Sequence, residues 1–248
     1  MSPPPDDSPP SPPAAKSVAE LMAAHIVDRL DLGAQLPSEA ELAAHFAVSR
    51  VTVREALKIL AGQGLVSLSR GRRATVTLPD GAMFGAFLRS LIHSDPRATF
   101  DLMQVRRSLE VQAVTLACRN ASRSGLAAVE AALDAMHAAA SAMPEDGADE
   151  ASGRAFDRAD VKFHQAMALA GGNRVLTYLF EAMEGALLEV FEGSRRGLRL
   201  RTGMLANVED HRTVLRHVGA RDERAAAEAM LTLISRAEAN LRAALAGN

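Results

Sequence analysis

Over residues 36–65, apolar side chains recur every three or four positions on two short segments, which is the spacing of one helix face. Ser38 stands before the first segment and Glu41 follows three residues later, as a capping box requires. Ser49 is placed to cap the second segment, and the short turn 47–49 separates the two. The pattern therefore predicts a helix-turn-helix. Its apolar positions are Leu42, Ala43, Phe46, Val48, Val53, Ala56, Leu57 and Leu60.

A change to period-two alternation follows directly and predicts two short strands, at 65–68 and 74–78. Gly62 and Gly64 end the second helix ahead of these strands. The tip between the strands, 69–73, centres on a glycine and carries three arginines. A two-stranded wing with arginines at its tip is suited to contact phosphates or a minor groove.

Positive charge gathers on the second helix and the wing. Residues 48–78 hold six basic side chains and one acid, whereas the whole chain has a formal net charge of −2. This local excess is typical of a phosphate-binding surface. The first turn of the second helix presents Arg50, Val51, Thr52 and Arg54. Arginine there can bind a guanine edge, and threonine can contact a thymine methyl group or a phosphate. A helical hairpin with a solvated basic face is the alternative, but it leaves the caps, the turn and the wing together unexplained.

The same stretch resembles the winged helix-turn-helix of the GntR family of bacterial transcriptional regulators. The matching residues are Leu36, Pro37, Ser38, Glu39, Leu42, Ala43, Val48, Ser49, Arg50, the run 52–57, Leu60, Gly64, Leu65 and Val66. The residues that we expect at DNA are Ser38, Glu39, Ser49, Arg50, Thr52, Arg54, Arg70, Gly71 and Arg72. One position departs from the family. It usually has a basic residue after Pro-Ser-Glu, where this chain has Ala40, so one phosphate or base contact is expected to be missing.

The remaining pattern predicts a mainly α protein with two folded parts. A proline-rich tail over 1–14 is expected to be disordered, and an amphipathic helix over 17–30 completes a DNA-binding domain at 15–79. A linker helix at 80–97 has an apolar stripe and should dock on its own effector domain or on a partner subunit. Helical spacing over 98–248 predicts one antiparallel all-α bundle for effector binding and dimerisation. The expected helices lie near 98–120, 123–142, 153–170, 173–192, 203–219 and 221–246.

Composition limits the class of protein further. Cys118 is the only cysteine, so an internal disulfide is excluded, and its apolar helical surroundings predict a buried structural thiol. No long uncharged apolar stretch predicts a membrane span, and no basic-then-apolar segment opens the chain as a secretion signal would. We therefore expect a cytoplasmic protein without a membrane partner.

Several polar side chains fall on apolar faces of the predicted bundle. Asp160 and His164 lie four residues apart on one helix, so they share a face. His211 begins another apolar helix, and a carboxylate with imidazoles on apolar faces suits a divalent metal. Arg106 stands among leucines and valines and needs an anion from the protein or from a ligand. An Asp/His pair at this spacing is more often a surface pair or a capping hydrogen bond, so spacing alone leaves both interpretations open.

The bundle resembles the all-helical effector domain, called FCD, of the FadR-type subfamily of GntR regulators, over residues 98–245. The matching residues are Leu102, Arg106, Leu109, Glu110, Asp160, His164, Gly172, Asn173, His211, Arg212, Leu215, Ala229 and Met230. In that family an aspartate and histidines ligate a metal. The resemblance therefore implies one divalent metal, of the zinc, nickel or manganese type, on Asp160, His164 and His211.

The resemblance also implies a small carboxylate effector bound by Arg106, with Asn173 as a further effector contact. The family usually has another histidine where this chain has Leu233, so only three protein ligands remain for the metal. The alternative is a metal-free regulator that responds to an acyl conjugate through Arg106 and an apolar cavity. The arginine-rich segment 192–202 is either a solvated loop between helices or an entrance to the effector site.

These features predict a homodimeric, ligand-responsive transcription factor. Two winged helices would read the half-sites of a palindromic operator, because a two-fold dimer requires two-fold DNA. Effector binding would change operator affinity by its differential binding energy for two states of the bundle. A metal-dependent enzyme built on the bundle is a rival, but it lacks a clear general base and leaves the winged helix unexplained. An architectural DNA-binding protein without an effector is a second rival, and it leaves the internal Arg/Asp/His set unexplained.

Overall fold

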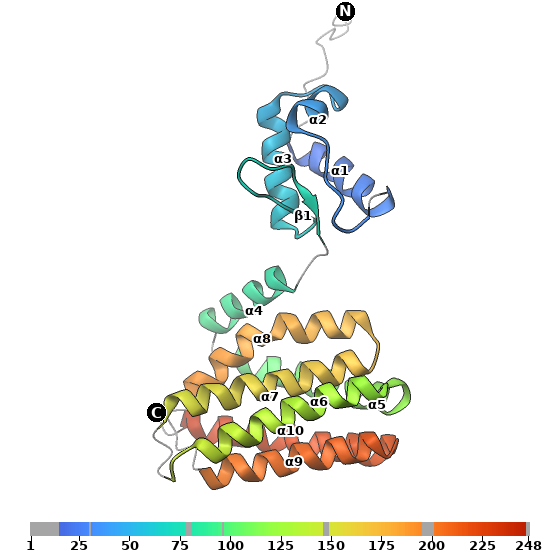
Figure 1. Cartoon of the computed structure of the whole chain (residues 1–248). Coiled ribbons are helices and arrows are strands. Elements are labelled where there is room, and N and C mark those ends of the chain that lie inside the picture. Colours follow the sequence, from blue (N-terminus) through green and yellow to red (C-terminus); the bar gives the residue numbers. More distant parts are fainter. Residues whose placement is uncertain are drawn as a thin grey trace, which may run out of the picture. The chain divides into compact units, whose positions relative to one another are not determined.

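The computed structural model describes residues 15–29, 31–77, 81–95, 97–145, 149–194 and 201–246, and the chain divides into two compact units (Figure 1). The boundary falls between Met83 and Phe84. Each unit has a hydrophobic core of its own. The tail predicted over 1–14 and most of the arginine-rich segment, 195–200, lie outside the described residues, so both interpretations stay predictions.

The first unit packs three helices and a small antiparallel sheet around one core. The chain forms α1 (Ala15–Arg29), α2 (Glu39–His45) and α3 (Arg50–Gly62), followed by β1 (Val66–Ser67) and β2 (Thr75–Val76). Both α1 and α2 pack on α3. The predicted winged helix-turn-helix is therefore confirmed. The larger side chains of its core are Val18, Met22, Ile26, Leu36, Leu42, Val53, Leu57, Leu60, Val66 and Val76.

Local hydrogen bonds fix where α2 and α3 begin. The Ser38 hydroxyl oxygen accepts the backbone N–H of Glu41 at 3.3 Å, and the Ser38 N–H donates to the Glu41 carboxylate at 2.7 Å. This is the predicted capping box. The Ser49 hydroxyl oxygen accepts the backbone N–H of Thr52 at 3.0 Å, so the second helix is also capped as predicted.

The wing is held by more than its two strands. β1 pairs with β2 in antiparallel orientation, and the segment before α2 bonds to the other edge of β2, where Leu36 donates its N–H to Ala74 O at 2.8 Å. The strands are shorter than the predicted 65–68 and 74–78. Two residues of each strand are paired, and one more hydrogen bond, from Thr77 N–H to Leu65 O at 3.0 Å, continues the contact away from the tip. At the other end the chain turns through the tip at Gly71, whose φ is +74°.

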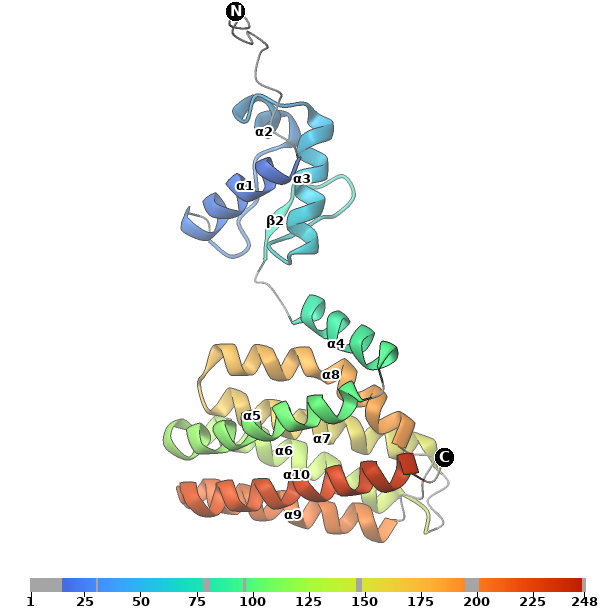
Figure 2. The ribbon, with the colours of Figure 1, turned by 180° about the vertical axis from the view of Figure 1, so that it is seen from behind.

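The second unit is an antiparallel helical bundle (Figures 1 and 2). In this unit α6 contacts both α7 and α9, while α5 contacts α7, α9 and α10. Methionine, leucine, valine and alanine fill most of the core, as the scarcity of aromatic residues requires. The predicted all-α bundle is confirmed. Its helices are α4 (Ala82–Ser94), α5 (Ala98–Asn120), α6 (Arg123–Ala142), α7 (Glu150–Ala170), α8 (Arg174–Ser194), α9 (Arg201–Gly219) and α10 (Glu223–Ala246).

Helix starts differ from the predicted ones by up to three residues, and capping explains the two clearest cases. The Asp149 carboxylate accepts the backbone N–H groups of Ala151 and Ser152, so α7 begins at residue 150 rather than near 153. Arg221 has a φ of +59°, which a helix does not allow, and the side chain of Asp222 caps α10 after it. The predicted start of α10 at residue 221 is therefore two residues too early.

One face of α4 lies directly against α8. A Cβ atom at Gly85 would lie 2.7 Å from the carbonyl oxygen of Ala182, and one at Gly185 would lie 2.5 Å from Arg89 Nη1. The backbone of α8 therefore leaves no room for a side chain at Gly85, whereas a side chain at Gly185 would displace the end of Arg89. Of the two docking partners predicted for this helix, the structure shows contacts with its own helical unit. The large apolar side chains that α4 leaves exposed are Phe84, Phe87 and Leu91.

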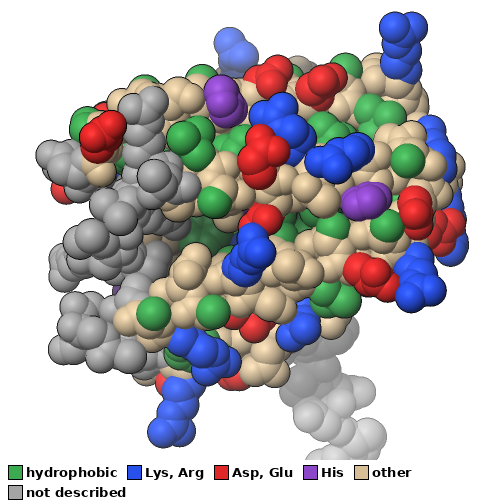
Figure 3. All heavy atoms as spheres, turned by 90° about the horizontal axis from the view of Figure 1, so that it is seen from below, with side chains coloured by type: hydrophobic (Ala, Val, Ile, Leu, Met, Phe, Trp, Pro, Cys, Tyr) green, Lys and Arg blue, Asp and Glu red, His purple; other side chains and the backbone are tan. Residues whose placement is uncertain are grey.

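The surface of the second unit has mixed charge. Figure 3 shows one face on which lysine and arginine side chains alternate with aspartate and glutamate, without a continuous patch of one sign among the described residues. Oppositely charged side chains of α9 and α10 pair with one another, as Arg236 does with Asp210 at 2.6 Å. A surface of this kind is not suited to a polyanion. Among the helices that the structure describes, none has the length and apolar character needed to cross a bilayer.

Candidate functional site

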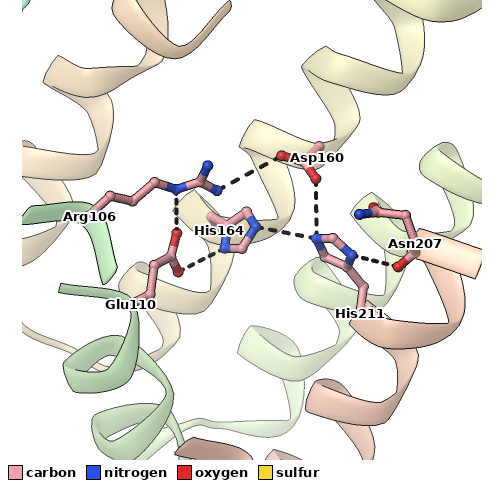
Figure 4. A network of polar contacts seen from close by, with 6 residues as sticks. All are labelled: Arg106, Glu110, Asp160, His164, Asn207 and His211. Carbon is pink, nitrogen blue, oxygen red and sulfur yellow. Dashed lines mark hydrogen bonds and ion pairs between the residues drawn. The ribbon is translucent and has the colours of Figure 1, made fainter. Parts of the chain in front are cut away.

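A buried polar network lies inside the second unit (Figure 4). Arg106 and Glu110 come from α5, Asp160 and His164 from α7, and His211 from α9. Four of these side chains are almost completely buried, and that of Asp160 is 13% exposed. Buried charges are costly unless they are paired, so five polar side chains in an apolar core indicate a specific site.

Three of these side chains converge on one point. His211 Nε2 lies 3.2 Å from Asp160 Oδ1 and 3.3 Å from His164 Nε2. One ligand atom from each of the three residues lies within 4.8 Å of the others. The structure therefore brings the predicted residues Asp160, His164 and His211 together, and in the described part of the chain they are the one group of histidine, cysteine or acidic side chains that could hold a metal ion.

The far nitrogen of each imidazole is held by an acceptor. His211 Nδ1 lies 2.8 Å from the carbonyl oxygen of Asn207, and His164 Nδ1 lies 2.7 Å from a carboxylate oxygen of Glu110. A carbonyl and an ionised carboxylate only accept, so both Nδ1 atoms carry the proton. When Nε2 of each ring is unprotonated, the two Nε2 lone pairs point at each other and at a carboxylate oxygen. This is the arrangement in which outer partners orient histidine ligands toward a cation.

Burial and neighbouring charges act against each other in this network. Burial by itself raises the pKa of Asp160, but the neighbouring His211, His164 and Arg106 outweigh burial and lower the pKa well below its usual range. Burial likewise opposes ionisation of Glu110, yet His164 and Arg106 lower its pKa. Burial lowers the pKa of His164 despite the adjacent Glu110 carboxylate. The carboxylates are therefore ionised and His164 is neutral at pH 7, which are the states that bind a metal.

Arg106 lies at the edge of the convergence point. Its Nε donates to Glu110 at 2.9 Å, its Nη2 lies 3.9 Å from Asp160 Oδ2, and its guanidinium carbon lies 5.8 Å from the centre of the Phe191 ring. The anion that a buried arginine needs is thus supplied in part by the protein itself. The long contact to Asp160 shows that this end of the guanidinium is less tightly engaged than the end that faces Glu110.

Other predicted positions stand apart from the network. The side chain of Asn173 is exposed and accepts the backbone N–H of Leu176 at 3.1 Å, so it caps α8. Leu233 is 2% exposed and belongs to the apolar core of α10. The effector role of Asn173 stays a prediction, and its capping role is sufficient to account for an asparagine at this position.

The sequence pattern did not indicate the outer partners of the two histidines. Glu110 appears in the sequence only as part of the family motif, although it lies four residues after Arg106 and therefore shares its helix face. A glutamate next to an arginine on a buried stripe was an available signal for a buried ion pair. The Asn207 carbonyl belongs to the backbone, so no side-chain pattern could have indicated it.

The DNA-facing candidates lie on the exposed surface of the first unit. Arg50, Arg70, Gly71 and Arg72 are exposed, as a phosphate or base contact requires. Ser38 and Ser49 have helix-capping roles, and the hydroxyl of Thr52 hydrogen-bonds that of Ser49 at 2.8 Å. The side chain of Val51 in the same first turn of α3 is 67% exposed, so this turn also presents an apolar surface that thymine methyl groups could contact.

Arg54 and Glu39 form a pair across the helix-turn-helix. Arg54 Nε donates to Glu39 Oε1 at 3.2 Å, and Arg54 Nη2 donates to Glu39 Oε2 at 2.7 Å. The side chains remain 57% and 37% exposed. Both residues were predicted to contact DNA, and the structure brings them together on the surface formed by the starts of α2 and α3.

Comparison with known families matches both units. Residues 14–76 match the family described as bacterial regulatory proteins, gntR family, and residues 101–236 match the FCD domain, which alone covers more than half of the chain. The chain belongs to the GntR family of regulators. The winged helix-turn-helix is its GntR domain, and the buried polar network lies in its FCD domain.

Curated relatives of this GntR regulator are transcription factors. The repressor NanR of Klebsiella aerogenes is 30% identical over 217 residues, which cover 85% of this chain and 78% of NanR. The galactonate operon transcriptional repressor of Escherichia coli is 28% identical over 214 residues, or 85% of this chain and 88% of the relative. A solved structure of a GntR protein from Streptococcus agalactiae has a TM-score of 0.68 at 24% identity, covers 90% of this chain and 98% of its own, and supports the fold.

Family membership decides between the three function classes that the sequence left open. This GntR-family protein is a DNA-binding transcriptional regulator with an FCD effector domain. It is neither the helical-bundle enzyme nor an architectural protein without an effector domain. GntR regulators bind operator DNA, typically as dimers.

Proposed function

We propose that this regulator binds a palindromic operator as a homodimer and that a small carboxylate, bound beside a divalent metal in the FCD domain, changes its operator affinity. The observation that carries the proposal is the convergence of His164 Nε2, His211 Nε2 and an Asp160 oxygen, with both Nδ1 atoms held from behind. As a regulator of a bacterial operator, the protein would act in the cytoplasm, where the chromosome lies.

The three converging residues fit a metal of the zinc, nickel or manganese type. Imidazole and carboxylate donors suit these ions, and a set of three protein ligands leaves coordination positions open for water or for an effector. A bound metal would supply a fixed positive charge and Lewis acidity toward an anionic ligand. Glu110 and the Asn207 carbonyl would hold the two imidazoles in the ligating orientation.

A small carboxylate is the effector class that the site favours. Arg106 is buried beside Asp160, and its longer contact to that carboxylate leaves hydrogen-bonding capacity on Nη2. A carboxylate placed there would meet both the guanidinium and the metal. One relative is named for the galactonate operon, and galactonate is a hydroxylated carboxylate.

A second candidate is a metal-free site that responds to an acyl conjugate. The observation that favours it is Leu233, which is buried in the apolar core at the position where the family usually has another histidine ligand. Loss of one imidazole weakens metal binding, and Arg106 with an apolar surrounding would then recognise the conjugate. The two candidates differ in whether the purified protein retains a metal.

Elemental analysis of the purified full-length protein is the first test. We expect one divalent metal per chain, its loss in the His164→Ala and His211→Ala variants, and a thermal shift when zinc, nickel or manganese is returned to chelated wild-type protein. His137→Ala is the matched control, because His137 is exposed and lies outside the network. A wild-type protein without metal and without any metal-dependent thermal shift would contradict the metal site and support the acyl-conjugate alternative.

The DNA-binding assignment has its own test. Arg50→Ala and Arg54→Ala should each weaken binding to a duplex selected by the wild-type protein from a random library, by about tenfold to a hundredfold if each arginine reads a base. Arg97→Ala, a change in the helical unit at the start of α5, is a control for loss of a single positive charge. Normal DNA binding by both Arg50→Ala and Arg54→Ala would contradict the assignment of α3 as the recognition helix.

A further inference from the structure

We propose that Glu39 is a positioning and specificity-determining residue, which holds the guanidinium of Arg54 in a base-reading orientation and does not itself contact DNA. The inference rests on the proposed operator binding by Arg54. It assigns Glu39 a role different from the direct DNA contact that the sequence pattern suggested.

The geometry of the pair is bidentate. Both oxygens of Glu39 are used, one by Arg54 Nε at 3.2 Å and the other by Nη2 at 2.7 Å. The residues lie 15 positions apart, at the first position of α2 and in the first turns of α3. Two parallel hydrogen bonds fix the plane of a guanidinium as well as its position. Glu39 therefore restrains a side chain that would otherwise sample many rotamers on an exposed surface.

The donors that remain free are suited to a base edge. The Nε and Nη2 edge of Arg54 faces the carboxylate, which leaves Nη1 and the second hydrogen of Nη2 at the end of the side chain. This end carries two roughly parallel N–H groups, the pattern that matches O6 and N7 of guanine. Glu39 thus binds one edge of the Arg54 guanidinium and leaves the other edge, with Nη1, free to contact a DNA base.

Helix α2 does not need this carboxylate for its start. The capping box of α2 is made by Ser38 and Glu41, so Glu39 takes no part in it. The carboxylate is also a negative charge on a surface where basic side chains are in excess and that is expected to bind phosphates. The Glu39 carboxylate should therefore weaken binding to every duplex by repelling phosphates. Only in a duplex that binds Arg54 does the contact made by the oriented guanidinium offset this loss of affinity. Specificity is a difference between affinities, so such a residue raises it by penalising the wrong sites.

The test compares two probes with full-length protein variants. One probe is a duplex selected by the wild-type protein from a random library, and the other is a mixed-sequence duplex of the same length. For Glu39→Gln we expect tighter binding to the mixed-sequence probe and a fall of about tenfold in the ratio of the two affinities. Fluorescence anisotropy at two salt concentrations measures both affinities and their salt dependence.

Glu55→Gln is the matched control. Glu55 lies on α3 next to Arg54, is 51% exposed, and is paired with Lys58 at 2.8 Å, so its replacement removes the same charge from the same surface without touching the bidentate pair. We expect this variant to tighten both probes by similar factors and to leave the ratio unchanged. Thermal melts of both variants check that the winged helix remains folded.

Three results would overturn the inference. An affinity ratio for Glu39→Gln equal to that of Glu55→Gln would show that only the charge matters. A new selection with Glu39→Gln that loses preference at a base other than the one lost by Arg54→Gln would show that Glu39 reads a base directly. If the wild-type protein selects no sequence at all, the operator proposal itself is overturned. This result differs from the first two, which overturn the role of Glu39 and leave operator binding intact.

Discussion

Two arginine–glutamate pairs in this protein have almost the same bond lengths and opposite surroundings. Arg54 and Glu39 meet at 2.7 Å with side chains that are 57% and 37% exposed, whereas Arg106 and Glu110 meet at 2.9 Å with side chains that are 1% and 0% exposed. Water can replace either partner of the first pair, so that pair adds little to the stability of the fold and can serve instead to orient Arg54. The second pair has no such substitute, so it fixes the site around it.

Removal of one carboxylate from each pair gives the largest expected contrast. Glu110→Ala should lower the free energy of unfolding by about 3–5 kcal/mol, because it leaves the buried Arg106 guanidinium and His164 Nδ1 without their acceptor. Glu39→Ala should leave the unfolding free energy unchanged within experimental error, because both partners of its pair are exposed. Urea unfolding followed by circular dichroism measures both variants. Equal losses of unfolding free energy in Glu110→Ala and Glu39→Ala would contradict the distinction between a buried pair that stabilises the fold and an exposed pair that does not.

A third arginine sharpens the comparison, because its partners are carbonyl groups. The Arg221 guanidinium donates to the carbonyl oxygens of Ala117, Cys118 and Ala121 at 2.6–3.1 Å and thereby caps the C-terminal end of α5. Arg221→Ala should cost about 2 kcal/mol of unfolding free energy, an effect between those of the two pairs. The same urea experiment measures it.

Arg221→Gly is the control for the backbone at this position. The φ of +59° is unfavourable for alanine and free for glycine, so the glycine variant should be the more stable of the two. An alanine variant as stable as the wild type would show that water replaces all three bonds.

The smallest effect is expected at a carboxylate whose main partners are not cations. Hydrogen bonds from the Ser152 side chain, and then from the backbone of Ser152 and Ala151, lower the pKa of Asp149. Since the folded pKa lies below the unfolded value near 3.9, the contribution of Asp149 is complete above about pH 4 and is lost as the pH falls through the folded pKa. Asp149→Asn should retain the cap at pH 7 and reduce the loss of stability in acid. Melting temperatures of the wild type and of Asp149→Asn, measured at pH 7 and at pH 3.5, test this expectation. If the difference in melting temperature between the two proteins is the same at both pH values, the expectation is contradicted.

The features that the sequence predicted best are those set by local rules. The Ser38 and Ser49 caps depend on neighbours within three residues, and the shared face of Asp160 and His164 follows from their spacing on one helix. These required no knowledge of packing. The start of α10 was misplaced because the left-handed backbone of Arg221 has no sequence signature for a residue other than glycine, asparagine or aspartate.

The rest of the site depends on how distant helices pack. His164 and Glu110 are 54 residues apart in the chain, and their hydrogen bond exists only because α5 and α7 lie side by side in the bundle. The Arg54–Glu39 pair likewise depends on the angle that the turn sets between two helices. Spacing along one helix cannot reveal contacts of this kind, and the resemblance to a family supplied the link between Asp160, His164 and His211 instead.

The convergence of His164 and His211 has a mechanical consequence. The two residues are 47 positions apart, so a cation shared by their Nε2 atoms would tie α7 to α9 and close a long loop of the chain, much as a disulfide would. The chain holds a single cysteine and cannot form such a crosslink by oxidation. A cation crosslink differs from a disulfide because it comes and goes with the concentration of the free ion, and the rigidity of the bundle would follow the supply of metal by mass action.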